Sequence, residues 1–80
     1  MKYYVFSIEQ VHGTGTALSE YATKSDAYDT EKAARTAYYN KLSAVNADLS
    51  DKGHSYMSIK IENSKGGVIK KDEIGEYIEA

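Results

Sequence analysis

Apolar and polar side chains alternate along the first stretch of the chain, KYYVFSIEQV (residues 2–11), which is also rich in β-branched and aromatic residues. This pattern predicts a β-strand with two distinct faces. Tyr4, Phe6 and Ile8 make the more apolar of the two sets, so we expect them to face the core. The other set would then point away from the core: Tyr3, Val5, Ser7, Glu9 and Val11.

A glycine-containing segment, HGTGT (residues 12–16), ends this strand. A second strand-like run follows it, ALSEYATK (residues 17–24). Two such runs joined by a short segment with glycines predict a β-hairpin. Residues 12–16 are therefore expected to be the turn.

Helical periodicity begins at Thr30. We expect Asp29 or Thr30 to be the N-cap, Glu31 to stabilise the first turn, and Gly53 to stop the helix. Apolar residues recur at steps of three and four, which predicts one buried helix face: Ala34, Ala37, Tyr38, Leu42, Val45 and Leu49.

The second half of the chain again has a strand pattern. YMSIKIE (residues 56–62) alternates, and NSKGG (residues 63–67) supplies turn residues. VIKKDEI (residues 68–74) is expected to return as a fourth strand. One side of the third strand should face the core: Met57, Ile59 and Ile61.

These elements predict a single α+β domain spanning residues 1–80, with the order ββαββ. If one helix packs on one face, the strands form a four-stranded antiparallel sheet in the order 2-1-3-4, with the two clearest strands at its centre. Residues 74–80 are left open, because Ile74, Tyr77 and Ile78 have helical spacing whereas Gly75 disfavours a helix.

A single helix leaves the other face of such a sheet uncovered. We expect this uncovered face to mediate self-association or the binding of a protein partner. The residues predicted to form the interface are Tyr3, Val5, Ser7, Tyr56, Ser58 and Lys60.

The composition favours binding over catalysis. Among 80 residues there are eight tyrosines, one phenylalanine and no tryptophan. Tyrosine is amphipathic and suits half-exposed surfaces. A domain of this size has little room for a deep pocket unless two subunits share one, and the chain has no cysteine. We therefore expect a non-enzymatic protein with no cofactor and no metal.

The side chains that could carry chemistry have simpler explanations. His12 and His54 fall in predicted loops, where the sequence shows neither an orienting partner nor a nucleophile. Two histidines are also too few for a usual zinc site. Asp26, Asp29 and Glu31 lack the spacing of a calcium loop and are interpreted as helix-capping residues.

The turn segment could instead bind an anion, which would make the protein a nucleotide-binding sponge. The residues concerned are His12, Gly13, Thr14, Gly15 and Thr16. Phosphate loops commonly lead into a helix, and the P-loop carries a lysine after its last glycine. Here a strand follows and the next lysine is Lys24, so the hairpin turn is favoured.

A second alternative is nucleic-acid binding by the lysine-rich hairpin formed by the third and fourth strands. Its lysines are Lys60, Lys65, Lys70 and Lys71. The net charge of −2 and the single arginine argue against this alternative.

Nothing in the sequence indicates a membrane or secretory location. No apolar run approaches the roughly 18 residues that cross a bilayer. Glu9 comes too early for a signal peptide. We expect a soluble, cytoplasmic protein.

Four segments, KYYVFSIEQV, GTGTA, YDTEKAARTAYYNKLSAV and NSKGGV, resemble small uncharacterised proteins encoded in phages and prophages of clostridial and related Firmicutes bacteria. The resemblance covers most of the chain and is most specific at YDTEKAARTAYY. It implies a phage or prophage protein that acts in the host cytoplasm by binding. The expected function is thus a non-enzymatic, homodimeric protein that binds a protein partner, possible targets being a host defence or regulatory component.

Overall fold

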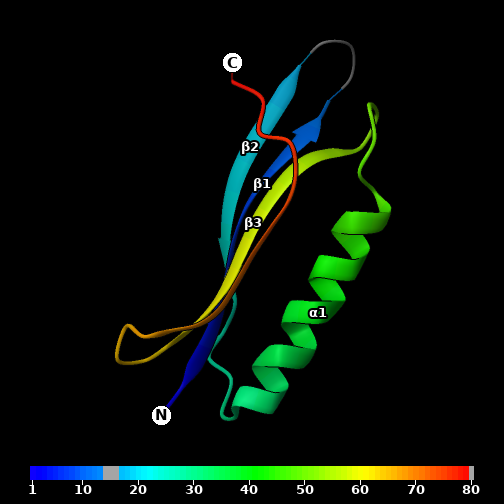
Figure 1. The fold of residues 1–80 in the computed structure, drawn as a ribbon. Helices are drawn as coiled ribbons and strands as arrows, with labels where there is room; N and C mark the ends of the chain where they lie inside the picture. Colours follow the sequence, from blue (N-terminus) through cyan, green and yellow to red (C-terminus); the bar gives the residue numbers. More distant parts are fainter. Residues whose placement is uncertain (14–16, 80) are drawn as a thin grey trace.

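The computed structural model describes residues 1–13 and 17–79 (Figure 1). These residues form four strands and one helix: β1 (Tyr3–His12), β2 (Leu18–Lys24), α1 (Glu31–Ala47), β3 (His54–Asn63) and β4 (Val68–Gly75). The strands form one sheet in the order β2-β1-β3-β4, and every neighbouring pair is antiparallel. The predicted α+β fold, element order and strand order are confirmed.

Helix α1 begins where the sequence indicates. Thr30 is the N-cap, and its side-chain oxygen accepts a hydrogen bond from the backbone N–H of Ala33 at 3.1 Å. The helix ends at Ala47, earlier than the predicted stop at Gly53. Gly53 instead closes a tight loop, where a Cβ would lie 2.4 Å from the carbonyl oxygen of Asp48.

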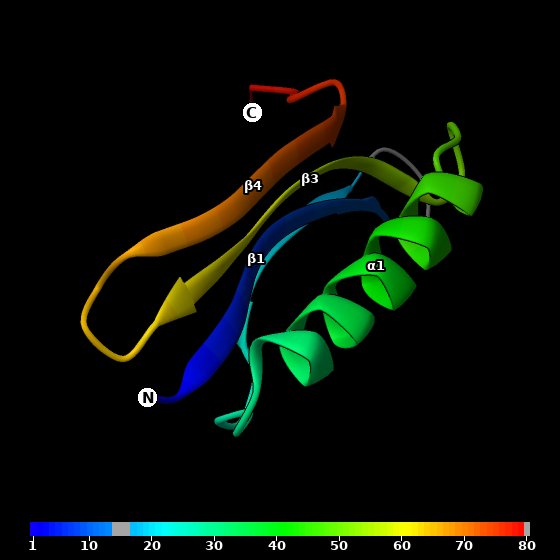
Figure 2. The same cartoon turned by 60° about the horizontal axis from the view of Figure 1, so that its bottom comes forward.

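The core lies between α1 and the two central strands (Figure 2). The largest fully buried side chains belong to α1 and β3: Tyr38, Met57, Ile59 and Ile61. The predicted core side of β3 is therefore confirmed, and so are Ala34, Tyr38 and Val45 of the helical stripe. The Tyr38 hydroxyl donates a hydrogen bond to the Asp72 carboxylate, and burial together with this bond raises the pKa of Tyr38.

The prediction for β1 was wrong about which face meets the core. Val5 belongs to the core, and Ser7 and Glu9 beside it are buried, whereas the Ile8 side chain is 47% exposed. The register with β3 explains the difference. Ser7 lies opposite Ile59, and directly opposite residues share one face of a sheet, so the apolar side of β3 places the other side of β1 against the helix.

Candidate functional site

The sheet surface that faces away from α1, called here the open face, is arranged in rows across the four strands. Directly paired residues share a face, so the register defines each row. The lysine row holds Lys24, Phe6, Lys60 and Lys71. The central row holds Ala22, Ile8, Ser58 and Glu73. The Gln10 row holds Glu20, Gln10, Tyr56 and Gly75.

Aromatic rings and ammonium groups meet in and beside the lysine row. The Lys24 Nζ atom lies 4.6 Å from the centre of the Tyr4 ring, and the Lys60 Nζ atom lies 5.3 Å from the centre of the Phe6 ring. Such cation–π contacts contribute about 0.5–1 kcal/mol each at exposed sites. Lys60 also forms an ion pair with Glu62, at 3.0 Å. This end of the open face is therefore aromatic and positively charged.

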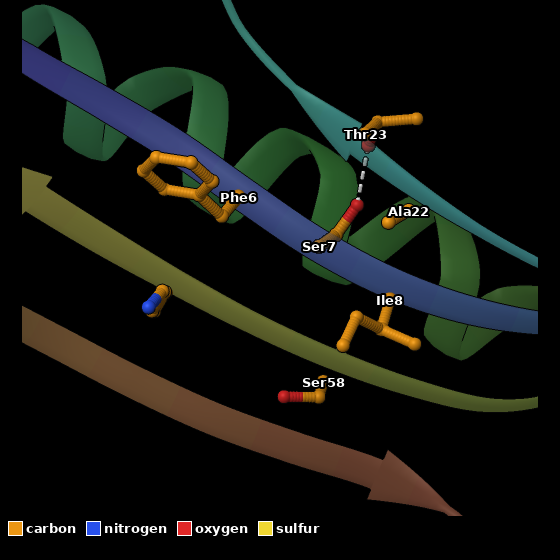
Figure 3. A pocket seen from close by; sticks show the side chains of 7 residues that line it. Phe6, Ser7, Ile8, Ala22, Thr23 and Ser58 are labelled. Carbon is orange, nitrogen blue, oxygen red and sulfur yellow. Dashed lines mark hydrogen bonds between the residues drawn. The ribbon is translucent and has the colours of Figure 1, made fainter.

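A shallow hollow of about 240 Å³ lies in the middle of the open face. Phe6, Ile8 and Ala22 supply its apolar lining, and Ser58 and Lys60 border it. Figure 3 shows these apolar side chains in front of the sheet, with the helix behind it. The lining of the hollow is mainly apolar.

The C-terminal segment, residues 76–79, covers the other end of the open face (red in Figure 1). The Gln10 side chain holds the Ile78 backbone at both polar groups: its amide N–H donates to the carbonyl at 2.8 Å, and its oxygen accepts from the N–H at 2.9 Å. The Tyr77 ring packs edge-on against the Tyr56 ring, with centroids 5.2 Å apart. The segment is thus fixed to the sheet by side chains and has no strand of its own.

Gly75 makes the turn onto the open face possible. Its φ of 76° is in the region that glycine adopts readily, and a Cβ there would lie 2.3 Å from the carbonyl oxygen of Ser55. The next residue, Glu76, donates its N–H to that same carbonyl at 2.8 Å. The structure therefore resolves the open question about the C-terminus: the segment turns at Gly75 and forms no helix.

Carboxylates surround this covered end. Burial raises the pKa of Tyr56, and the charges of Glu73 and Glu20 raise it further. A hydrogen bond to Glu20 raises the pKa of Tyr77. The open face therefore has a positive end at the lysine row and a negative end at the Gln10 row.

The predicted interface residues divide between the two faces. Tyr56, Ser58 and Lys60 lie on the open face, as expected. Val5 and Ser7 are buried against the helix, and Tyr3, on the same side of β1, packs against the core. Their assignment to the open interface was wrong, and Tyr4, Phe6 and Ile8 stand on the open face instead.

The four lysines proposed for nucleic-acid binding do not form one surface. Lys60 and Lys71 are paired neighbours on the open face. Lys70 lies on the opposite face, 3.6 Å from the Asp72 carboxylate and 6.0 Å from the centre of the Tyr38 ring. Lys65 lies in the turn between β3 and β4. Lys24, which the sequence did not single out, joins the positive end of the open face.

The proposed anion loop is only partly described, since Thr14, Gly15 and Thr16 lie outside the described residues. The pairing of His12 with Leu18 confirms the hairpin. The backbone N–H of His12 donates to the Gly53 carbonyl at 2.8 Å, and that of Gly13 donates to the Ala17 carbonyl at 2.7 Å. Both amides are thus already engaged by the protein.

A buried polar cluster links the helix to the sheet on the covered face. Glu9, only 3% exposed, is its centre. The Glu9 carboxylate lies 3.0 Å from the Lys41 Nζ atom and 2.9 Å from the His54 Nε2 atom, and it accepts a hydrogen bond from the Ser7 hydroxyl at 3.0 Å. The other His54 nitrogen, Nδ1, lies 2.7 Å from the Asp48 carboxylate. Three elements, β1, α1 and β3, therefore meet at Glu9.

The cluster is suited to holding the fold together. Burial raises the pKa of Glu9, but the hydrogen bonds from Lys41 and His54 outweigh it, so the pKa lies below its usual value. A hydrogen bond from His54 also lowers the pKa of Asp48. Both imidazole nitrogens face carboxylates, and neither is directed at a nucleophile. Within residues 1–13 and 17–79, every buried side-chain nitrogen or oxygen has a hydrogen-bond partner.

The sequence contained few signs of this cluster. It placed Glu9 on the uncovered face and treated His54 as a loop histidine. A useful signal is the polar pair Ser7 and Glu9 on the same side of β1 as Val5, since a buried carboxylate requires a cation such as Lys41 opposite it.

Over the described part of the chain, no group of three or more His, Cys, Asp or Glu side chains could hold a metal ion. Nor does any helix there have the length and apolar character needed to cross a bilayer.

Comparisons with protein-family models, with curated proteins and with solved structures found no match for this chain.

Proposed function

We propose that the protein is a non-enzymatic binding protein that docks a protein partner on the open face. The observation that carries the proposal is the apolar hollow at the centre of that face, where Ile8 and Phe6 lie beside Ala22 without a covering helix. An exposed apolar centre with a charged rim is typical of a binding surface. The proposed interface is still the uncovered face of the sheet, but Tyr4, Phe6 and Ile8 of β1 now replace Tyr3, Val5 and Ser7.

The energetics of the open face fit this proposal. Covering the exposed part of Ile8 and the ring of Phe6 removes apolar surface from water, at about 25 cal/mol per Å². The surrounding charges, Lys24, Lys60 and Glu73, would lie at the rim, where they affect orientation and association rate more than affinity. The centre of the face therefore supplies the affinity and its two ends supply the specificity.

The biological setting is part of the same proposal. It comprises a phage or prophage gene, action in the host cytoplasm, and a target among host defence or regulatory proteins. The proposal also includes self-association into a homodimer, because a face exposed on one copy is exposed on every copy.

The two alternatives have less support. A nucleotide sponge near residues 12–16 needs backbone amides free for phosphate, whereas those of His12 and Gly13 are engaged. Nucleic-acid binding is supported by the rings of Tyr4 and Phe6 beside lysines, a combination that single-stranded chains can stack on. The acidic end of the same face opposes it.

A comparative capture experiment tests the proposal. Wild-type protein, Ile8→Glu and Tyr39→Glu are immobilised and exposed to lysate of a clostridial or related bacterium, with and without nuclease treatment. Ile8 on the open face and Tyr39 on α1 are both 47% exposed, so the second variant is a matched control. Circular dichroism checks that all three proteins fold.

We expect a host protein that wild type and Tyr39→Glu retain, and that Ile8→Glu loses at least about tenfold. The same proteins retained by all three would contradict the proposal. Material that disappears on nuclease treatment and binds far more weakly in high salt would favour the nucleic-acid alternative.

A further inference from the structure

We propose that the open face binds a second copy of this chain, face to face, about a two-fold axis that lies across the strands along the central row. The inference rests on the proposed function, because it needs the open face to be a docking surface. It adds the orientation of the two sheets and the residues that face each other.

The charge distribution of the open face is self-complementary. Lys24, Lys60 and Lys71 stand at one end, where Glu62 offsets one of the three positive charges. Glu20 and the C-terminal segment, which carries Glu76 and Glu79, stand at the other. A surface with one positive and one negative end attracts a copy of itself that is turned end for end.

Two symmetric face-to-face arrangements are possible, with the two-fold axis either along the strands or across them, and the positions of the rows distinguish between them. A two-fold axis along the strands would place each lysine row over the other lysine row, which like charges disfavour. An axis across the strands places the lysine row of one copy over the Gln10 row of the other. The two rows are equally far from the central row, two residues along each strand and thus about 6.6 Å. That axis also brings the two copies of Glu73 together on β4, which is one like-charged pair. Two opposite-charged pairs of Lys24 with Glu20 outweigh it, so charge still selects the second arrangement.

The shape of the open face agrees with this choice. The C-terminal segment adds material over β1 and β3 at the Gln10 row, and it presents Tyr77 and Ile78, which are 48% and 40% exposed. The hollow lies over β1, β2 and β3, between the central row and the lysine row. An axis across the strands keeps each strand opposite its own copy, so the segment of one copy meets the hollow of the other. Ile8 lies close to the axis and meets Ile8 of the second copy.

One charge pair makes the arrangement testable. Lys24 and Glu20 are both exposed and both lie on β2, in the lysine row and the Gln10 row. In the proposed dimer, Lys24 of each copy faces Glu20 of the other, which gives two equivalent pairs. An axis along the strands would instead bring Lys24 over the β4 edge, far from Glu20.

The experiment uses two single charge reversals, Lys24→Glu and Glu20→Lys, studied alone and mixed. Sedimentation velocity over a concentration series, at low and high salt, measures the dimer. Each variant alone should self-associate at least about tenfold more weakly than wild type, because both pairs become like-charged. An equimolar mixture should form a heterodimer of wild-type affinity, because both pairs again join opposite charges, one pair with its native sign and the other with reversed sign. Lys32→Glu, on the helix, is the control and should leave the dimer unchanged.

The outcomes separate this inference from the proposed function. Wild type that stays monomeric at all concentrations, while Ile8→Glu still loses a captured host protein, would overturn the dimer and leave the open face as a docking site. A wild-type dimer whose single variants fail to associate when mixed would overturn the orientation. A monomer that instead binds a single-stranded oligonucleotide in a salt-sensitive way would overturn both.

Discussion

The covered and open faces of the sheet show two different uses of the same four strands. On the covered face, Met57, Ile59 and Ile61 are fully buried and the carboxylate of Glu9 has several partners. On the open face, Ile8 remains half exposed and the charges are segregated toward opposite ends. The covered face therefore stabilises the monomer, whereas the open face leaves apolar side-chain surface exposed to solvent.

The largest expected difference in the free energy of unfolding is between the same substitution, isoleucine to alanine, on the two faces. Ile59→Ala removes a fully buried side chain and should lower the free energy of unfolding by about 2–5 kcal/mol, because a cavity is left in the core. Ile8→Ala removes a half-exposed side chain and should cost less than about 1 kcal/mol in the monomer. Urea unfolding at low protein concentration measures both. Equal losses for the two variants would contradict the distinction between the faces.

A smaller effect is expected from the polar cluster of the covered face. Glu9→Gln leaves Lys41 and His54 without their buried carboxylate, so we expect a loss of about 1–3 kcal/mol at pH 7. Glu20→Gln, on the open face, serves as the exposed control and should cost little in the monomer. Urea unfolding of the two variants beside wild type measures the difference.

The same cluster predicts how stability depends on pH. The pKa of Glu9 is lower in the folded protein than in the unfolded chain, so its contribution is fully present above the unfolded pKa. It is lost as the pH falls through the folded value, and Asp48 acts in the same direction. Wild type should therefore lose stability as the pH falls below about 4.5, and Glu9→Gln should lose less. Identical acid dependence in both proteins would contradict the role of Glu9.

The smallest expected effect on stability concerns the C-terminal segment. Gly75→Ala puts a side chain against the Ser55 carbonyl in a positive-φ conformation, so we expect a loss of about 1 kcal/mol and release of the segment. Gly66→Ala has the same backbone strain at a site with open space around it, which makes it the control. Hydrogen exchange of the Ile78 amide reports the release: protection should fall with Gly75→Ala and persist with Gly66→Ala. Unchanged protection in both would show that Gly75 does not hold the segment in place.

The sequence was sufficient for features that depend on local periodicity. The strand and helix order, the core side of β3 and the Thr30 cap all follow from patterns within about ten residues. The strand order also followed, since the clearest strands occupy the centre of the sheet. The site was predicted only in part: Tyr56, Ser58 and Lys60 were placed correctly, but Lys24, Gln10 and the residues after Gly75 were not connected with them.

Only the tertiary structure decided which face of β1 meets the helix. Its two sides are both partly apolar, and a one-residue difference in register exchanges them, so the strand alone carries no decisive preference. Pairing with β3 settled the choice. Contacts between residues far apart in the chain were also decided only by the tertiary structure. His54 contacts Glu9, 45 positions away, and Ile78 contacts Gln10, 68 positions away. Local periodicity contains no information about such pairs, because they form only when packing brings separate elements together.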